Sequence, residues 1–381
     1  MITRSGVTVA VVAVVFGVAG FALRYPELVV ISAAAACALL VAGAWLLVSP
    51  NVTISRDVRP ARVVEGEPAF GYLVVTNVSK RRCPPTLAEE RVAGATVGIA
   101  LPSLGAGARA ERGYAIPTGR RGVFEIGPLT VGHSDPLRLV HVGQTRPERS
   151  VLRVRPRIHA VGPMPTGGSH DLDGPTSDAA PQGGVAFHSL REYVRGDDLR
   201  LVHWRSTART GTLMVRHNVV PNEPTMVVVL DTSAAPYTDD FFEDAVRVAA
   251  SLAVAGRTHG FPVQLWTTGG ERVTAGRGAA SADEALDLLA GVRPSADDAG
   301  LAALTGLSPS AAGVALGVVT GQPPPEQLGV VTTVRPRYSM VSVVQVGERF
   351  GRPAAPLTGA MVINVRTSDE FAAVWAARTR Q

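Results

Sequence analysis

A chain of 381 residues is long enough for two or three domains with hydrophobic cores of their own. The formal net charge is +5, but Lys80 is the only lysine and the arginines are spread along the chain. With no zinc-finger, helix-turn-helix or RNA-binding motif present, this charge does not indicate a nucleic-acid-binding protein. The two cysteines, Cys37 and Cys83, predict no disulfide framework or metal site, and two free thiols suit a reducing compartment.

Two apolar segments near the N-terminus, residues 7–23 and 28–48, are each close to the ~20 residues that a membrane-spanning helix needs. Residues 24–27 form a short polar turn between them, which predicts a transmembrane helical hairpin over residues 1–49. More arginines flank the hairpin than occupy its turn, so both ends and the bulk of the chain are expected in the cytoplasm. A cleaved signal peptide over the first segment is the alternative and would invert this topology.

Residues 50–160 predict a β-sandwich of immunoglobulin-like type, because many short apolar runs alternate with turn residues and show no helical period. The expected strands are 52–55, 70–76, 97–101, 112–116, 123–126, 129–131, 137–142 and 151–155, with turns at 65–68, 127–128 and 135–136. Residues 161–188 are rich in Gly, Pro, Ser and Asp and predict a linker.

Residues 189–221 interleave six arginines with aromatic and acidic side chains. The sequence Gly196-Asp197-Asp198 predicts a turn that opens a short helix, with Asp197 or Asp198 as the N-cap. Leu201, Trp204 and Ala208 would form one apolar stripe, Gly211 would end the helix, and residues 212–216 would form a strand. Such a segment forms either an internal lattice of ion pairs or a docking surface. The candidate binding residues are Arg191, Tyr193, Gly196, Asp197, Arg200, His203, Trp204 and Arg209.

This segment resembles the signature of a bacterial family called domain of unknown function 58. The matching residues are Arg191-Glu192-Tyr193, Gly196-Asp197-Asp198, Arg200, Val202-His203-Trp204, Ala208-Arg209-Thr210-Gly211 and Met214-Val215-Arg216. The resemblance implies a membrane-anchored protein that works beside a MoxR-type AAA+ ATPase, sometimes with a transglutaminase-like membrane protein. We therefore expect a non-catalytic adaptor in the bacterial plasma membrane, with a role in envelope assembly or stress.

Residues 222–381 predict a doubly wound α/β domain, because buried-type strands alternate with amphipathic helices. The expected strands are 225–231, 262–267, 314–319, 329–334 and 341–345, and the expected helices are 239–259, 281–291 and 371–378.

The first strand of this domain resembles that of a von Willebrand factor A-like domain, which binds a divalent cation through an Asp-x-Ser-x-Ser motif. Asp231 and Ser233 match the motif, whereas Ala235 has no oxygen to offer. The motif is thus incomplete for Mg²⁺, unless Asp239 or Asp240 and Thr267 or Thr268 supply further ligands. Otherwise Asp231 and Ser233 cap the next loop and helix. A metal-dependent adhesion module is the alternative function, and Mg²⁺ is the one cofactor considered.

A hydrolase is the remaining alternative. His203 and Ser206 are three residues apart on the expected helix, with Asp197 or Asp198 nearby to orient the imidazole. No Gly-x-Ser-x-Gly elbow, Walker loop or His-Glu-x-x-His motif is present in the sequence, so we expect no enzyme.

Overall fold

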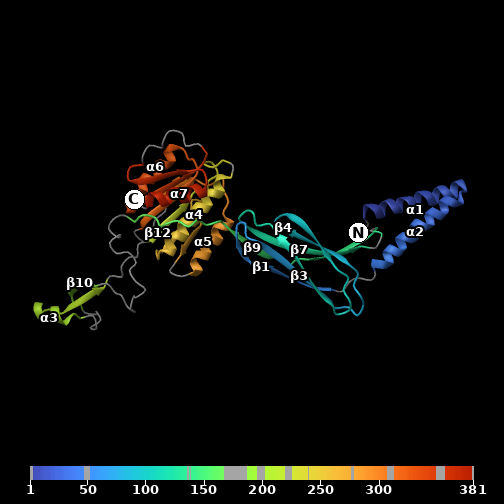
Figure 1. The fold of residues 1–381 in the computed structure, drawn as a ribbon, viewed down its shortest axis with the longest axis horizontal. Helices are drawn as coiled ribbons and strands as arrows, with labels where there is room; N and C mark the ends of the chain where they lie inside the picture. Colours follow the sequence, from blue (N-terminus) through green and yellow to red (C-terminus); the bar gives the residue numbers. More distant parts are fainter. Residues whose placement is uncertain are drawn as a thin grey trace. The chain divides into compact units, whose positions relative to one another are not determined.

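The computed structural model describes residues 3–46, 52–134, 137, 139–166, 187–194, 202–218, 225–238, 240–275, 279–306, 313–348 and 357–379. The chain divides into two compact units, Met1–Pro156 and Arg157–Gln381. The first holds a helical hairpin and a β-sandwich, and the second holds an α/β domain and a small hairpin module (Figure 1).

Two apolar helices open the chain, α1 (Arg4–Leu23) and α2 (Pro26–Leu46), as expected. Each is long and apolar enough to cross a membrane, with mean hydropathies of 2.5 and 2.2. Their close packing depends on two glycines in α1. A Cβ atom on Gly17 would lie 2.8 Å from Ser32 Oγ, and one on Gly20 would lie 2.8 Å from Val29 Cγ2. Ser32 Oγ donates to the Ala13 carbonyl at 2.6 Å, which satisfies its hydroxyl between the helices.

The β-sandwich consists of two sheets around one core. The first sheet has the order β1 (Val52–Arg59), β3 (Ala69–Asn77), β6 (Arg109–Ile116). The second has the order β2 (Arg62–Val64), β9 (Ser150–Arg155), β7 (Gly122–Ser134), β4 (Thr86–Val92), β5 (Ala95–Leu101), and β8 (His141–Arg146) also pairs with β7. Leu73 and Ile54 from the first sheet meet Ile126 and Leu152 from the second in the shared core. The expected β-sandwich is therefore present.

Some details of the sandwich differ from the expectation. Residues 127–128 were expected to be a turn between two strands, but they lie inside the long strand β7. Gly127 has a φ of 111°, and the pairing of β7 with β4 shifts register there, so the strand passes through a bulge without ending. Strand β4 was not expected, because Glu89, Glu90 and Arg91 hide its alternation.

The α/β domain is built on a six-stranded sheet with the order β14 (Arg272–Ala275), β13 (Val263–Thr267), β12 (Thr225–Leu230), β15 (Gly313–Thr320), β16 (Met340–Val346), β17 (Ala360–Val365). All neighbours are parallel except β14, which is antiparallel to β13. Helices α4 (Phe241–Thr258), α5 (Ala279–Gly291) and α7 (Ser368–Thr379) share one core with the sheet. Helix α6 (Pro325–Val334) and the 3₁₀ helix η2 (Gly300–Gly306) share the other.

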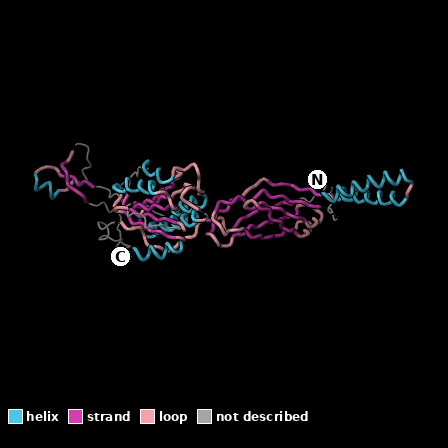
Figure 2. The backbone as a smooth tube through the Cα atoms, turned by 90° about the horizontal axis from the view of Figure 1, so that it is seen from above, coloured by secondary structure: helices cyan, strands magenta, loops and turns pink. Residues whose placement is uncertain are grey.

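The sheet is buried on both faces, as the continuous apolar runs predicted. In β12, Met226, Val228 and Leu230 face the first core, whereas Val227 and Val229 face the second. Figure 2 shows helices on both sides of these strands. The doubly wound architecture is confirmed.

One expected strand is wrong. Residues 329–334 form the end of α6, followed by a short 3₁₀ turn, η3 (Arg335–Arg337). The β-branched run Val330–Thr333 suggested a strand, but Leu328, Val331 and Val334 recur at helical spacing and pack against the sheet. Strands β14 and β17 were not expected at all.

Residues 157–166, which we call the strap, lie in the second unit and pack along its helices. Met164 is 2% exposed and sits in the core, where a Cβ atom on Gly317 would lie 2.5 Å from its sulfur. The Trp375 indole donates to the Gly162 carbonyl at 2.9 Å, and the His159 amide donates to Ser251 Oγ at 3.0 Å. The observed boundary thus falls four residues before the expected one, and the rest of the expected linker, residues 167–186, lies outside the described residues.

Candidate functional site

The signature segment forms a small hairpin module, described over residues 187–194 and 202–218. Strand β10 (Phe187–Glu192) pairs antiparallel with β11 (Met214–Asn218), and the short helix α3 (Trp204–Thr210) lies between them in sequence. Val202 forms a bridge with Val215, and both are buried. This pair gives the module a very small core.

Helix α3 begins at Trp204, and its N-cap is His203 rather than an aspartate. His203 Nδ1 accepts from the Ser206 amide at 3.3 Å and lies 2.8 Å from Ser206 Oγ. An imidazole nitrogen can replace the usual side-chain oxygen here, because the cap needs only an acceptor. The helix that contains Trp204 thus begins later than expected, and the expected caps, Asp197 and Asp198, lie outside the described residues. Gly211 ends the helix at a φ of 77°, as expected.

No residue of α3 is buried. Trp204 is 68% exposed and Ala208 is exposed, so the described part of the expected apolar stripe faces solvent; Leu201 lies outside the described residues. Arg205 and Arg209 are also exposed, and within the described part of the chain neither makes a hydrogen bond or an ion pair. These two arginines are thus not part of an internal ion-pair lattice.

The other candidate residues of the segment are placed less completely. Arg191 lies in β10 opposite Val215, and the Tyr193 amide donates to the Leu213 carbonyl at 2.8 Å. Gly196, Asp197 and Arg200 lie outside the described residues.

A second group of polar side chains gathers where the central strands of the α/β sheet end. Asp231 follows β12 and is fully buried. Its Oδ1 accepts from the Ser233 amide at 3.0 Å and from Ser233 Oγ at 2.6 Å, and its Oδ2 accepts from Thr320 Oγ1 at 2.7 Å. Burial raises the pKa of Asp231, and these hydrogen bonds offset part of the rise.

Asp298 is the residue of this group that the sequence analysis missed. Its Oδ2 accepts from Thr232 Oγ1 and from Thr268 Oγ1, each at 2.6 Å, and its Oδ1 accepts from the Gly300 amide at 2.9 Å. Thr268 Oγ1 also lies 3.4 Å from Asp231 Oδ1, so one hydroxyl lies between the two carboxylates. We call Asp231, Ser233, Thr268, Asp298 and Thr320 the polar cluster. The pair Asp297-Asp298 shortly before Gly300 was the available sequence signal.

The polar cluster offers the kind of oxygen ligands that Mg²⁺ prefers, but few carboxylates. Ala235 is exposed and supplies no oxygen, Asp240 is exposed at the start of α4, and Asp239 lies outside the described residues. Thr267 Oγ1 accepts from the Glu271 amide, so Thr268 is the threonine that reaches Asp231. Within the described ranges, no three His, Cys, Asp or Glu side chains form a metal-ligating group.

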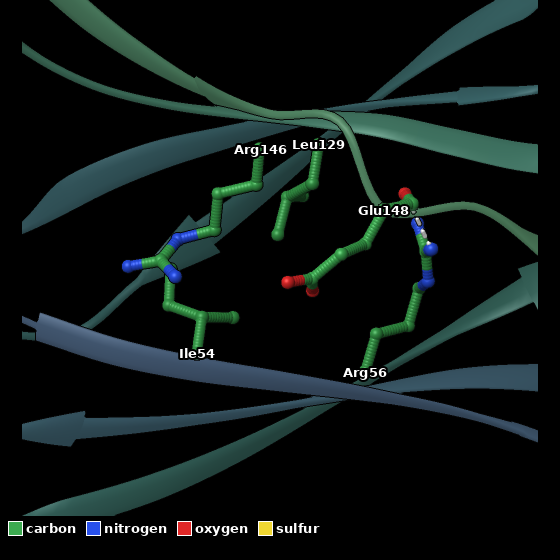
Figure 3. Close-up of a pocket in the computed structure, with 5 residues that line it drawn as sticks. All are labelled: Ile54, Arg56, Leu129, Arg146 and Glu148. Atoms are coloured by element: carbon green, nitrogen blue, oxygen red, sulfur yellow. Dashed lines mark hydrogen bonds between the residues drawn. The ribbon is translucent and has the colours of Figure 1, made fainter.

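The sandwich contains a small cavity of about 10 Å³, room for about one water molecule. Ile54, Arg56, Leu129, Arg146 and Glu148 line it (Figure 3). Arg56 Nη2 donates to the Glu148 carbonyl at 2.7 Å, and Arg146 Nη2 donates to the Val52 carbonyl at 2.9 Å. Because both guanidinium groups are bonded and the cavity is this small, it is not a ligand site.

Several solved structures are weakly similar to parts of the chain. The CARDB domain of the PF1109 protein from Pyrococcus furiosus is 18% identical, and the match covers 28% of this chain and 93% of that chain with a TM-score of 0.23. A putative cell surface protein domain from Methanosarcina acetivorans is 16% identical, with 28% and 91% covered and a TM-score of 0.21. Cwp6 from Clostridium difficile is 11% identical, with 77% and 37% covered and a TM-score of 0.15. Scores this low carry no argument about function.

No curated protein matches the chain. A family model described as "Protein of unknown function DUF58" matches residues 189–321, a span that includes the whole polar cluster and the hairpin module from Ser189 onward. This match over residues 189–321 agrees with the resemblance found in the signature segment.

Proposed function

We propose that the chain is a non-catalytic adaptor, anchored in the bacterial plasma membrane by α1 and α2, that binds a MoxR-type AAA+ ATPase in envelope assembly or stress. One observation carries the proposal: α3 exposes Trp204, Arg205 and Arg209 and buries none of its residues. Tryptophan and arginine are the residues most often found at the energetic centre of protein interfaces. The family resemblance supports the choice of ATPase, and a transglutaminase-like membrane protein is the second partner that we propose.

The adaptor must present its second unit to the compartment that contains the ATPase. The arginines on both sides of the hairpin support a cytoplasmic location for the bulk of the chain. Fusions of a cytoplasmic and an extracytoplasmic reporter to the C-terminus test this. A C-terminal fusion that is active only outside the membrane would contradict the proposed orientation.

The binding test uses the full chain in nanodiscs and the purified ATPase, with and without ATP. Trp204→Ala should weaken binding by about 30-fold, since loss of an interface hot spot costs about 2 kcal/mol or more. Phe70→Ala is the matched control, because Phe70 is an exposed aromatic of the sandwich, 40% accessible. Equal binding by the wild type and a folded Trp204→Ala variant would end the proposal.

The contact between His203 and Ser206 supports a structural role rather than catalysis. The imidazole nitrogen that meets Ser206 Oγ also accepts from the Ser206 amide, which is the arrangement of a helix cap. A hydrolase would also need oxyanion donors and an oriented base. Turnover of ester, peptide or phosphate substrates that is abolished by His203→Ala would revive the enzyme hypothesis.

The polar cluster favours one second candidate, a metal-dependent adhesion module that binds a protein ligand. Here the favourable observation is that Asp298 adds a second carboxylate close to Asp231, linked through Thr268. Calorimetry of the full chain with Mg²⁺ and Ca²⁺ tests it, with Asp298→Asn as the comparison. Heat of binding that disappears in Asp298→Asn would support the module, whereas no heat and no thermal shift would exclude it.

A further inference from the structure

The exposed surface of α3 combines one aromatic side chain with two cations. Trp204 and Ala208 are four residues apart, and so are Arg205 and Arg209, so the two pairs form neighbouring rows on the helix. We call these four residues the α3 face. Trp204 differs from Trp266 and Trp375 of the α/β domain, which are 3% and 0% exposed. A large apolar ring is thus held in solvent next to two guanidinium groups.

Positive charge predominates among the described residues of the module, which do not include Asp197 and Asp198. Glu192, on β10, is the only carboxylate among its described residues, whereas Arg191, Arg205, Arg209 and Arg216 are all cationic. Helix α3 itself contains no acidic residue. Two like charges four residues apart weaken a helix in isolation, so the pair on α3 does not serve the stability of the module.

The module also gains little stability from its own contacts. An isolated two-stranded hairpin is marginal in water, and so is a seven-residue helix. Among the module's residues whose burial the structure describes, Val202 and Val215 are the buried ones, so a partner that covers α3 would stabilise the module.

We infer that the α3 face binds an acidic protein surface, on which carboxylates flank an apolar pocket for the Trp204 indole. The inference rests on the proposed adaptor function and specifies the chemistry of the partner. Each exposed guanidinium can form a bidentate ion pair with a carboxylate, and burial of the indole adds apolar contact beside these pairs.

A protein partner fits the α3 face better than a membrane or a nucleic acid does. A helix that lies in a membrane interface needs a broad apolar face, and α3 has one large apolar residue in seven. Single-stranded nucleic acids are held by successive aromatic platforms along a basic groove, whereas the α3 face has one aromatic ring.

The test needs a defined acidic probe that does not depend on the ATPase. We choose a fluorescent random copolymer of glutamate and tyrosine, with a lysine–tyrosine copolymer as its counterpart, and measure fluorescence anisotropy with the full chain in nanodiscs. The double variant Arg205→Gln/Arg209→Gln should bind the acidic copolymer at least tenfold more weakly than the wild type. Trp204→Ala should also weaken it. Affinity should fall as salt rises from about 0.05 to 0.5 M, because exposed ion pairs are screened.

The matched control is Arg366→Gln/Arg378→Gln, which removes two exposed arginines of the α/β domain and should leave binding unchanged. All four arginines are exposed, so both variants should keep the circular dichroism spectrum and melting temperature of the wild type. Equal losses in the two double variants, or equal binding of the lysine copolymer, would overturn the inference, because the binding would not come from the α3 face.

The last part of the test measures binding of the full chain to vesicles of phosphatidylglycerol and phosphatidylcholine. Arg205- and Arg209-dependent binding to the anionic vesicles, without binding to the acidic copolymer, would assign the face to lipid and refute a protein partner. Binding of the ATPase that needs Trp204 but not the two arginines would refute the acidic surface and leave the adaptor standing. Copolymer binding through the α3 face without ATPase binding would support the acidic surface and refute the proposed ATPase adaptor. Binding of neither would end both proposals.

Discussion

Replacing Arg56 by methionine should destabilise the β-sandwich by about 3–5 kcal/mol, because it leaves a buried carboxylate without its cation. Arg56 lies on β1 and Glu90 on β4, so their ion pair joins the two sheets; their side chains are 7% and 0% exposed. Arg56 Nη1 donates to Glu90 Oε1 at 2.5 Å, and the Tyr114 hydroxyl donates to Glu90 Oε2. Burial and the neighbouring Glu90 raise the pKa of Tyr114, which keeps this hydroxyl a donor.

The assay measures unfolding of the sandwich alone, through the thiol of Cys83, which lies in the sandwich core and is 4% exposed. Burial also raises the pKa of the Cys83 thiol, so a maleimide should label it slowly until the sandwich unfolds. In a Cys37→Ser background, labelling during urea titration of the full chain reports this unfolding. At a typical m-value of about 2 kcal/mol/M, the midpoint of Arg56→Met should fall by about 1.5–2.5 M.

Two comparisons separate the ion pair from the general effect of losing an arginine. Arg149 and Glu125 form a pair of the same length, 2.5 Å, with side chains 59% and 60% exposed, so Arg149→Met should cost at most about 1 kcal/mol. Arg56→Met/Glu90→Leu should cost much less than the sum of its single changes, since no charge is left unpaired. Equal costs for Arg56→Met and Arg149→Met, or strict additivity in the double variant, would refute the reasoning.

Three further predictions concern the second unit. His159 Nε2 is buried and has no hydrogen-bond partner among the described residues. Burial lowers the pKa of this imidazole below 6.5, with Asp369 and Asp244 opposing that shift and Arg157 and Arg247 adding to it. Because the folded-state pKa is lowered, the neutral imidazole favours the packed strap above pH 6.5, and this stability is lost as the pH falls through the folded-state pKa. The equilibrium constant for packing of the strap falls by at most about tenfold per pH unit. The hydrogen-exchange protection factors of residues 157–166, which correct the observed rates for the intrinsic rate at each pH, should therefore fall on acidification in the wild type but not in His159→Phe. Met164→Ala should lower the free energy of unfolding of the second unit by about 2–5 kcal/mol in a denaturant titration, and no change would show that the strap is not part of its core. Asp231→Ala should cost about 1–3 kcal/mol or more by the same measurement, because Ser233 and Thr320 lose their acceptor, and a neutral result would mean that water replaces the carboxylate.

The local pattern of the sequence predicted most elements of this protein. The two apolar helices, the alternating strands around Leu73 and the fully apolar strand β12 each follow from a period that depends only on near neighbours. Gly211 as a helix end is a prediction of the same kind, since a positive φ favours glycine wherever it occurs. The family signature also lies in one continuous segment, so it can be recognised without knowledge of the tertiary structure.

Contacts between distant segments decided the rest. Residues 329–334 have the composition of a strand and form a helix, because the helix buries Leu328 and Val331 together against the sheet. The bulge at Gly127 depends on its partner strand. Asp298 and Asp231 are 67 positions apart in the sequence and are linked through the hydroxyl of Thr268. A pattern among neighbouring residues cannot predict a contact between such distant positions. The sequence alone determined which residues carry charge, an aromatic ring or a hydroxyl. Only the tertiary structure decided that Asp231 is buried and bonded while Trp204 and its arginines remain in solvent, because burial depends on which other segments cover a residue.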